Sequence, residues 1–197
     1  MGPNIKPVPR GQKITDVISG EVVLKVEDNI STDHIVPSDS KLLPYRSNVE
    51  HLAKFAFSKV DSEFYDRAIH AKQGFIVGGD NYGQGSSREH AALVPSYLNI
   101  RGVIAVSFAR IHRSNLINNG ILPLVINKED YALISQGDQI ELVDAKGSVE
   151  EDREVTILNK TTLKTIKATL NLSQREKQML LYGGLLNMIK ETGGQKI

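Results

Sequence analysis

The chain has 197 residues, of which 40% are hydrophobic and 24% are charged, and its formal net charge is +1. This composition is typical of one globular domain, and the near-neutral charge favours neither nucleic acid nor an anionic membrane as a partner. The absence of cysteine excludes disulfides, thiolate zinc sites, a cysteine nucleophile and an iron–sulfur cluster held by this chain. A chain without disulfides or a membrane-length apolar segment fits a cytoplasmic protein.

The N-terminal part combines a tail, a strand and a polar loop. Residues 1–13 contain three prolines and two glycines and predict a flexible tail or linker at the start of a single domain, residues 1–197. Residues 21–26 predict a strand. Residues 28–40 form a polar loop with acids, hydroxyls and a histidine, the kind of segment in which functional residues concentrate. Two helices are predicted near residues 49–57 and 62–71.

The middle of the chain alternates strands and helices. Strands are predicted at residues 74–77, 101–107 and 121–126, with helices at 87–98 and 108–118 between them. This βαβαβ order predicts a parallel sheet with crossover helices, followed by a short helix at 128–134. Residues 139–143, 154–158 and 163–168 alternate apolar and polar residues and predict antiparallel ribbons, with a turn at 159–162. From Leu172 onward the chain is predicted helical, with a break at Gly183-Gly184.

Residues 78–90, GGDNYGQGSSREH, form a glycine-rich loop between a predicted strand and a predicted helix. Such a loop leaves backbone N–H groups free to bind an anion, and the helix dipole favours negative charge there. The phosphate-loop motif is excluded because no Gly-Lys-Ser or Gly-Lys-Thr occurs, and the nucleophile elbow is excluded because no Gly-x-Ser-x-Gly occurs. The dinucleotide-binding motif is excluded because Arg88 stands in place of its third glycine. The loop therefore predicts a carboxylate or phosphate site beside a serine.

A purely structural interpretation of this loop is a capped helix start. Ser86 and Glu89 have the spacing of a capping box, in which each side chain satisfies a backbone N–H of the other residue. We predict that this box forms, although it does not account for Ser87, Arg88 and the cluster of glycines. A second capping box is predicted at Ser173 and Glu176.

The two polar loops follow different predicted strands. Ligands of open parallel sheets bind at the carboxyl ends of the strands. If the two strands are neighbours, Asp33, His34 and Arg46 face Ser86, Ser87 and Arg88. Two arginines and a helix N-terminus suit a substrate with several carboxylates, and nearby positive charge lets a serine act as a base.

The five histidines show no pair at the spacing of helical metal ligands, so no metal site is predicted on this chain. His90 and His112 are interpreted as packing or hydrogen-bonding residues. Arg110 and Arg113 are interpreted as surface or salt-bridge residues.

Residues 80–93, DNYGQGSSREHAAL, closely resemble the signature of the aconitase C-terminal swivelling domain, in the superfamily that includes isopropylmalate isomerase small subunits. STDHI at residues 31–35, SFARIH at 107–112 and GILPL at 120–124 match in order and spacing. The resemblance implies an α/β fold: a swivelling β/β/α domain with a mixed, mostly parallel sheet, flanking helices and antiparallel ribbons. It also implies partner domains that hold a four-iron four-sulfur cluster, with no cofactor on this chain.

The resemblance also implies roles for single residues. Ser86 resembles the serine that removes the substrate proton as an alkoxide, and Ser87 and Arg88 resemble the pair that holds a substrate carboxylate. Arg46 resembles a second carboxylate-binding arginine, and Asp33 resembles an active-site acid that orients the arginine and serine groups.

Three further residues, Thr32, His34 and Gly85, are weaker site candidates from the same resemblance. VPSD at residues 36–39 departs from the pattern of mitochondrial-type enzymes, so the resemblance gives no firm substrate contact for Ser38.

The implied function is that of part of an aconitate hydratase, a hydro-lyase of the tricarboxylic acid cycle that interconverts citrate and isocitrate through cis-aconitate. The chain would be a fragment or a separate subunit, its partner the remaining aconitase domains or a large subunit, and its substrate a tricarboxylic acid. No membrane or nucleic-acid partner is predicted, and the isolated chain is expected to be inactive.

Two alternatives remain. The chain could be the small subunit of isopropylmalate isomerase or homoaconitase. Those usually carry Asp-Thr-Asp where this chain has Ser31-Thr32-Asp33, and Phe-Gly-Cys-Gly-Ser-Ser where it has YGQGSS at residues 82–87, so both differences favour aconitate hydratase. It could also be a binding or regulatory module without catalysis; some aconitases bind RNA after cluster loss, but the near-neutral charge gives that no support.

Overall fold

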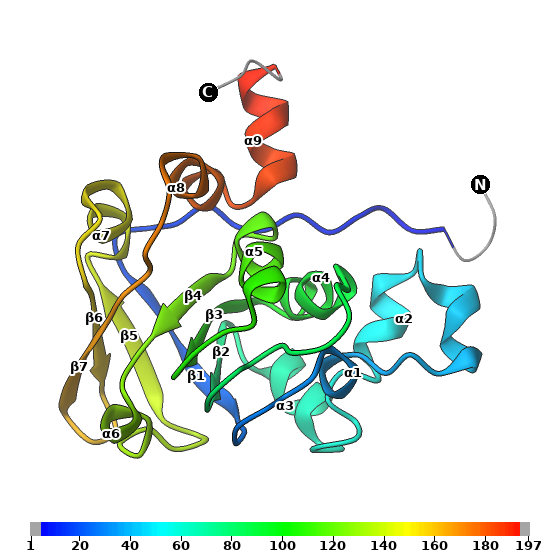
Figure 1. The fold of residues 1–197 in the computed structure, drawn as a ribbon, viewed down its shortest axis with the longest axis horizontal. Helices are drawn as coiled ribbons and strands as arrows, with labels where there is room; N and C mark the ends of the chain where they lie inside the picture. Colours follow the sequence, from blue (N-terminus) through cyan, green and yellow to red (C-terminus); the bar gives the residue numbers. More distant parts are fainter. Residues whose placement is uncertain (1–4, 194–197) are drawn as a thin grey trace.

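A computed structural model describes residues 5–193 as a mixed α/β fold around one seven-stranded sheet, in the order β4-β3-β2-β1-β5-β6-β7 (Figure 1). The strands are β1 (Ile18–Lys25), β2 (Gly74–Gly78), β3 (Ile100–Ala105), β4 (Leu122–Val125), β5 (Gln139–Val143), β6 (Val155–Asn159) and β7 (Lys164–Ala168). The helices are α1 (Thr32–Ile35), the 3₁₀ helix η1 (Ser40–Tyr45), α2 (Val49–Ala53), α3 (Phe64–His70), α4 (His90–Tyr97), α5 (Arg110–Asn118), α6 (Lys128–Tyr131), α7 (Ala145–Glu151), α8 (Gln174–Leu181) and α9 (Leu185–Thr192).

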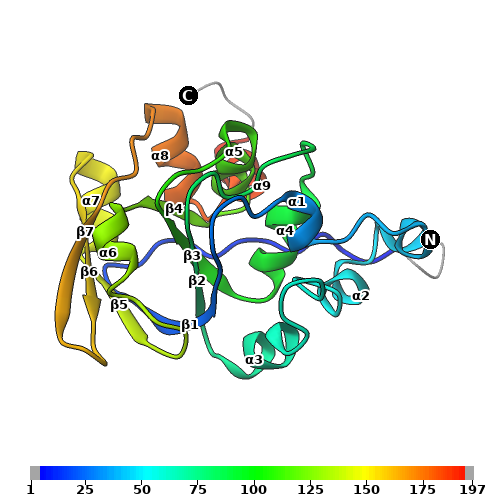
Figure 2. The same ribbon diagram turned by 60° about the horizontal axis from the view of Figure 1, so that its bottom comes forward.

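The sheet has a parallel half and an antiparallel half. Strands β1 to β4 pair in parallel, and β5 pairs antiparallel with both β1 and β6, which in turn pairs antiparallel with β7. The predicted βαβαβ unit is confirmed as β2-α4-β3-α5-β4, and the predicted turn joins β6 to β7. Figures 1 and 2 show α2 at one end of the molecule and β5–β7 with α7 at the other.

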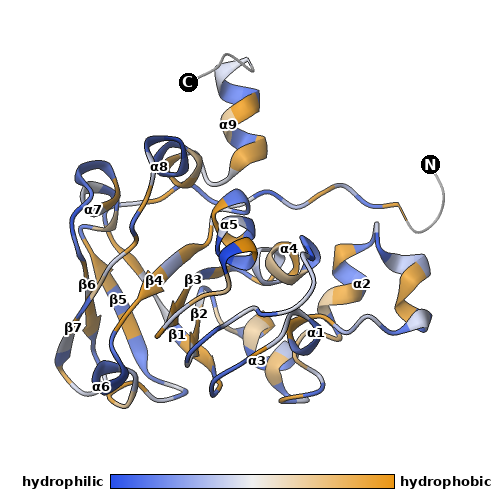
Figure 3. Cartoon of the chain, viewed as in Figure 1, coloured by the Kyte–Doolittle hydropathy of each residue, from blue (hydrophilic) through white to orange (hydrophobic). Residues whose placement is uncertain are grey.

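Two apolar clusters cover the two faces of the sheet, and strand alternation assigns residues to them. On β2, Ile76 belongs to the cluster that contains α2, α3 and α4 side chains, whereas Phe75 and Val77 belong to the cluster formed with β5–β7 and α8. All five residues of β2 are buried, as expected of a central parallel strand. Figure 3 shows the apolar strands at the centre of the fold. No helix within residues 5–193 has the length and apolar character needed to span a membrane.

The predicted capping box at Ser86 and Glu89 is wrong. Helix α4 begins at His90 rather than Ser87, and its N-cap, Glu89, makes no side-chain cap hydrogen bond. The Glu89 carboxylate instead accepts a 2.9 Å hydrogen bond from the Asn119 side chain. Gly85, with φ +98, turns the backbone just before Ser86, so residues 85–88 form a loop rather than the first helical turn. The Ser86 hydroxyl is therefore not used as a cap.

At the other end of the chain the same sequence spacing does form a cap. Ser173 accepts a hydrogen bond from the Glu176 backbone N–H, and the Glu176 carboxylate accepts one from the Ser173 backbone. The predicted break is also confirmed, since Gly183 and Gly184 separate α8 from α9 with φ values of +77 and +115. Sequence patterns did not predict three short helices: α1 inside the polar loop, η1 directly after it, and α7 between β5 and β6.

The segment before β1 follows the surface of the domain. Of the predicted tail, residues 1–4 lie outside the described residues, and residues 5–13 contain no helix or strand. The Lys6 N–H donates to the Ser47 carbonyl at 3.0 Å. The buried Arg101 guanidinium on β3 donates to the carbonyls of Gln12 and Lys13 at 3.3 and 2.9 Å. This part of the segment is therefore attached to the fold.

Candidate active site

Three loops meet at the carboxyl ends of β1, β2 and β3, where ligands of parallel sheets bind. The loop after β2 joins the loop after β1 through a bridge between Gln84 and Ser31, and joins the loop after β3 through a bridge between Tyr82 and Phe108. The N–H of Gly83 also donates to the Ile30 carbonyl at 2.7 Å. The neighbouring strands thus bring the two polar loops together, as the sequence predicted.

Glycine is required in this loop for two reasons. At Gly83, φ is +82 and a Cβ atom would lie 2.1 Å from the imidazole ring of His112. At Gly85, φ is +98, but a Cβ atom would meet only the Thr32 hydroxyl, at 3.6 Å. Gly83 therefore permits close packing on α5, whereas Gly85 supplies the backbone turn that presents the serines.

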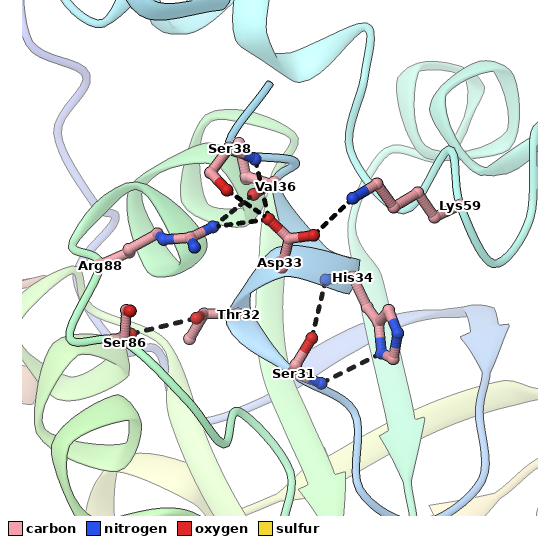
Figure 4. A network of polar contacts seen from close by, with 9 residues as sticks. All are labelled: Ser31, Thr32, Asp33, His34, Val36, Ser38, Lys59, Ser86 and Arg88. Atoms are coloured by element: carbon pink, nitrogen blue, oxygen red, sulfur yellow. Dashed lines mark hydrogen bonds and ion pairs between the residues drawn. The ribbon is translucent and has the colours of Figure 1, made fainter. Parts of the chain in front are cut away.

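The loop presents Ser86 and Ser87 to solvent. The buried Thr32 hydroxyl donates a 3.0 Å hydrogen bond to the Ser86 carbonyl and so fixes the Ser86 backbone (Figure 4). Neither serine hydroxyl forms a hydrogen bond with another residue in the described part of the chain. Thr32 therefore positions the loop, and both hydroxyls are available to a ligand.

Asp33 lies at the centre of a polar network (Figure 4). One carboxylate oxygen accepts from the Arg88 guanidinium at 3.0 Å and from the Ser38 hydroxyl and N–H at 2.7 and 2.9 Å. The other oxygen accepts from the Lys59 ammonium. Hydrogen bonds from Lys59, then Ser38 and Arg88, hold the pKa of the Asp33 carboxyl far below its usual range.

This geometry defines what Asp33 can do. A carboxylate that stays ionised and accepts several hydrogen bonds orients its donors, but it is a poor proton carrier near neutral pH. Asp33 thus holds the Arg88 guanidinium, which also donates to the Val36 carbonyl at 3.3 Å. The predicted orienting role requires this pairing of Asp33 with Arg88, and the role itself stays a prediction.

Arg46 and Arg88 line one cavity of about 220 Å³, together with Ser38 and Ser87. Arg46 caps the end of η1, and its carbonyl accepts a 2.8 Å hydrogen bond from the His90 ring, which ties η1 to α4. We call this space the Arg46 cavity. Two guanidinium groups at one cavity suit a ligand with more than one carboxylate.

His34 takes no part in this arrangement. Its ring accepts a 3.2 Å hydrogen bond from the Ser31 N–H, and its own N–H donates to the Ser31 hydroxyl at 3.1 Å. These bonds form a capping box at the start of α1, and Figure 4 shows the ring directed away from Ser86 and Arg88. Lys59 and Ser38 are the residues that sequence reasoning did not assign; Lys59 follows α2 in a segment without a recognisable motif. Within residues 5–193, no group of three or more His, Asp or Glu residues is placed to hold a metal ion.

The fold and this loop cluster define an α/β domain with polar loops at the carboxyl ends of its parallel strands. The model of the aconitase C-terminal domain family matches residues 26–129. The chain is 38% identical to the 3-isopropylmalate dehydratase small subunit 2 of Archaeoglobus fulgidus, over 88% of this chain and 95% of that subunit. It is 30% identical to a probable mitochondrial aconitate hydratase of Dictyostelium discoideum, over 92% of this chain but 27% of that protein.

A solved structure gives the same result. The crystal structure of 3-isopropylmalate dehydratase from Methanocaldococcus jannaschii matches with a TM-score of 0.74 and 32% identity, over 90% of this chain and 95% of that one. The chain belongs to the aconitase C-terminal domain family. It spans about a quarter of the length of the aconitate hydratases it matches, but nearly all of the small subunits.

Proposed function

We propose that this chain is the swivel domain or small subunit of an aconitate hydratase-type hydro-lyase and supplies the base and carboxylate-binding groups of its active site. One observation carries the proposal: Arg88 is held by Asp33 beside two free serine hydroxyls, with Arg46 across the same cavity. Its relatives include aconitate hydratases and 3-isopropylmalate dehydratase subunits, and the acids in these names carry more than one carboxylate.

The proposed chemistry divides the work among these residues. Arg46 and Arg88, with the Ser87 hydroxyl, bind substrate carboxylates through charge-assisted hydrogen bonds. The Ser86 oxygen takes the proton from the carbon next to a bound carboxylate, because the nearby guanidinium groups stabilise the alkoxide. Asp33 acts through Arg88 as a positioning residue. Gly85 and Thr32 act through the backbone of Ser86.

The expected four-iron four-sulfur cluster belongs to the proposed partner. This chain contains no cysteine and so offers no thiolate ligand for such a cluster. A cluster held by the remaining aconitase domains or by a large subunit would polarise the leaving hydroxyl group when bound. The isolated chain is therefore expected to be inactive and to bind citrate weakly. We also propose a cytoplasmic location for this chain. Several aconitate hydratase relatives are named mitochondrial, which is the alternative location.

A second candidate is the small subunit of a 3-isopropylmalate dehydratase or homoaconitase. This candidate is favoured because the chain aligns with nearly the full length of such subunits. One example is the methanogen homoaconitase small subunit of Methanocaldococcus jannaschii, which is 36% identical and is covered over 88% of its length. Ser31 and Gln84 favour aconitate hydratase instead, because the small subunits usually carry Asp and Cys there. The substrate, rather than the chemistry of Ser86 and Arg88, separates the two candidates.

The test is reconstitution with a cluster-loaded partner. The chain is mixed with the remaining aconitase domains, or with a large subunit, and turnover of citrate and of isopropylmalate is compared. Ser86→Ala should lower kcat by about 10²–10⁴-fold, the usual contribution of a general base. Ser58→Ala, at an exposed serine outside the loop cluster, is the matched control. Full turnover in Ser86→Ala would exclude the serine as base, and preference for isopropylmalate would select the second candidate.

A further inference from the structure

A second cavity, of about 200 Å³, lies on the α5 side of the serine loop. We call it the α5 cavity. Ser87 lines both this cavity and the Arg46 cavity, whereas Ser86 lines only the α5 cavity. The remaining lining residues come from the loops and from the first turns of α5, and none is acidic: Thr32, Gly83, Gly85, Ala109, Arg110, Ile111, His112 and Asn115.

The wall contributed by α5 contains several hydrogen-bond donors. The first helical hydrogen bond of α5 runs from Arg113 to the Ala109 carbonyl, and Ala109 provides no side-chain cap. The N–H groups of residues 110–112 therefore have no acceptor among residues 5–193. Arg110 is a lining residue of the same cavity, and its guanidinium forms no ion pair or hydrogen bond with the described residues. Positive charge and free N–H groups thus coincide at the start of a nine-residue helix.

His112 provides an independent sign of a ligand. Its side chain is buried, at 2% exposure, and neither ring nitrogen has a hydrogen-bond partner within the described residues. Gly83 packs on the ring, where even a methyl group would not fit. A buried polar group without a partner is rare, because its loss of hydration is not compensated, and it calls for a water molecule or a ligand group. His112 is among the residues that line the α5 cavity, which is thus the space beside the ring where such a group could lie.

We propose that the α5 cavity is a second oxyanion subsite, which binds one carboxylate between Arg110, the free N–H groups of α5 and the His112 ring. Burial lowers the pKa of His112 to about 4, so at neutral pH the ring is uncharged and donates at most one hydrogen bond. The subsite then carries one full positive charge, on Arg110, which matches the charge and bidentate geometry of a carboxylate. It stands whether or not Ser86 acts as a base.

Two sources can supply this carboxylate: a small polycarboxylic acid, or an Asp or Glu side chain of a partner chain. The serine loop separates the two cavities and Ser87 touches both. A polycarboxylic acid that occupied both cavities would therefore lie across the serines, whereas a partner side chain would need only the α5 cavity. Arg110 would determine binding in either case.

The experiment is an NMR titration of the ¹⁵N-labelled chain with tricarballylate, an unreactive tricarboxylate, at constant ionic strength. The amide signals of residues 110–112 and the ring ¹⁵N signals of His112 should shift and saturate. Arg110→Met should raise the Kd obtained from these shifts about tenfold or more, as expected from the loss of a charge-assisted hydrogen bond. Arg175→Met, at an exposed arginine on α8, should leave it unchanged. Arg88→Met should abolish shifts around the Arg46 cavity but preserve those of residues 110–112.

A parallel titration with N-acetylaspartate amide identifies the source. Equal affinity for both probes indicates that the carboxylate comes from an Asp or Glu side chain of a partner. Binding of tricarballylate that is at least tenfold tighter indicates a polycarboxylic acid. Both results support the subsite. Signals of residues 110–112 and His112 that stay constant, or that shift equally in Arg110→Met, overturn it. Because these signals are read from the chain alone, a failure of reconstituted turnover would not affect the result.

Discussion

Gly83 allows the loop after β2 to lie directly on the His112 ring, and this contact sets the position of the serines. Replacement by alanine would place a methyl carbon 2.1 Å from the ring, at a φ of +82. Gly83→Ala should therefore destabilise the chain by about 2–4 kcal/mol, from backbone strain and overpacking together. The check is urea unfolding against Gly137→Ala, where φ is +90 but no atom lies within 4 Å of the added methyl group. Equal losses in the two variants would mean that the His112 contact is unimportant.

Asp33 should titrate far below an ordinary aspartate, because Lys59, Ser38 and Arg88 all donate to its ionised form. Since the pKa is lowered on folding, the stabilisation is complete above about pH 4, the unfolded value, and is lost as the pH falls through the folded value. The carboxyl ¹³C signal of Asp33 would report this titration. Lys59→Met should raise the midpoint, whereas Lys54→Met, an exposed lysine nearby, should not. An unchanged midpoint in Lys59→Met would show that Lys59 does not control Asp33.

The contrast between Asp33 and Lys59 shows how far sequence reasoning reaches at a site. Asp33 and Arg88 lie on loops that follow two neighbouring parallel strands. Because the carboxyl ends of parallel strands lie at the same edge of the sheet, the sequence could predict that these two loops meet. Lys59 comes from a turn-rich segment after α2, and its approach to Asp33 depends on tertiary packing that no local pattern encodes. The sequence also did not predict the hydrogen bonds between His34 and Ser31, because a histidine replaces the usual Glu or Gln of a capping box.

Two Ser-x-x-Glu segments of this chain have opposite structural outcomes at helix starts. Ser173 caps α8, whereas Ser86 caps no helix because the glycine turn delays the start of α4 to His90. Ser173→Ala should cost about 1 kcal/mol of unfolding free energy. Ser86→Ala should change it by less than about 0.5 kcal/mol, as is usual for an exposed side chain without hydrogen bonds. Urea denaturation of both variants checks this. A loss of unfolding free energy in Ser86→Ala as large as that in Ser173→Ala would contradict the structure. If Ser86→Ala is as stable as expected, any loss of turnover in that variant comes from the chemical step and not from unfolding.

The strands and helices that sequence patterns predicted best are those in which burial dominates. The central strands β2, β3 and β4 are continuous apolar runs with helices between them, so their type and order were evident. Helix α1 has four residues and depends on the Ser31–His34 cap, and α7 starts after Asp144 in a left-handed conformation. Such short helices lack a periodic apolar face, and they form because the rest of the fold holds them.

The whole molecule combines a cluster of polar loops at one edge of the parallel half of its sheet with an N-terminal segment that contacts the same half. Arg101, on β3, is 5% exposed and donates to two carbonyls of that segment, those of Gln12 and Lys13. The side chain of Gln12 adds a 3.0 Å hydrogen bond to Asn99. A buried guanidinium that satisfies backbone carbonyls links the segment to the strand that precedes α5. Its loss would leave those carbonyls without a donor among the described residues.

Arg101→Met keeps the length and much of the apolar stem of the side chain but removes both donors. We expect it to lower the free energy of unfolding by about 2 kcal/mol, the scale of hydrogen bonds made by a charged group. Trypsin should then cleave faster after Arg10 and Lys13, because release of the segment exposes its backbone. Arg175→Met is again the control, since it removes an exposed arginine and should change neither quantity. Unaltered cleavage in Arg101→Met, with stability equal to that of the control, would show that Arg101 does not hold the segment in place.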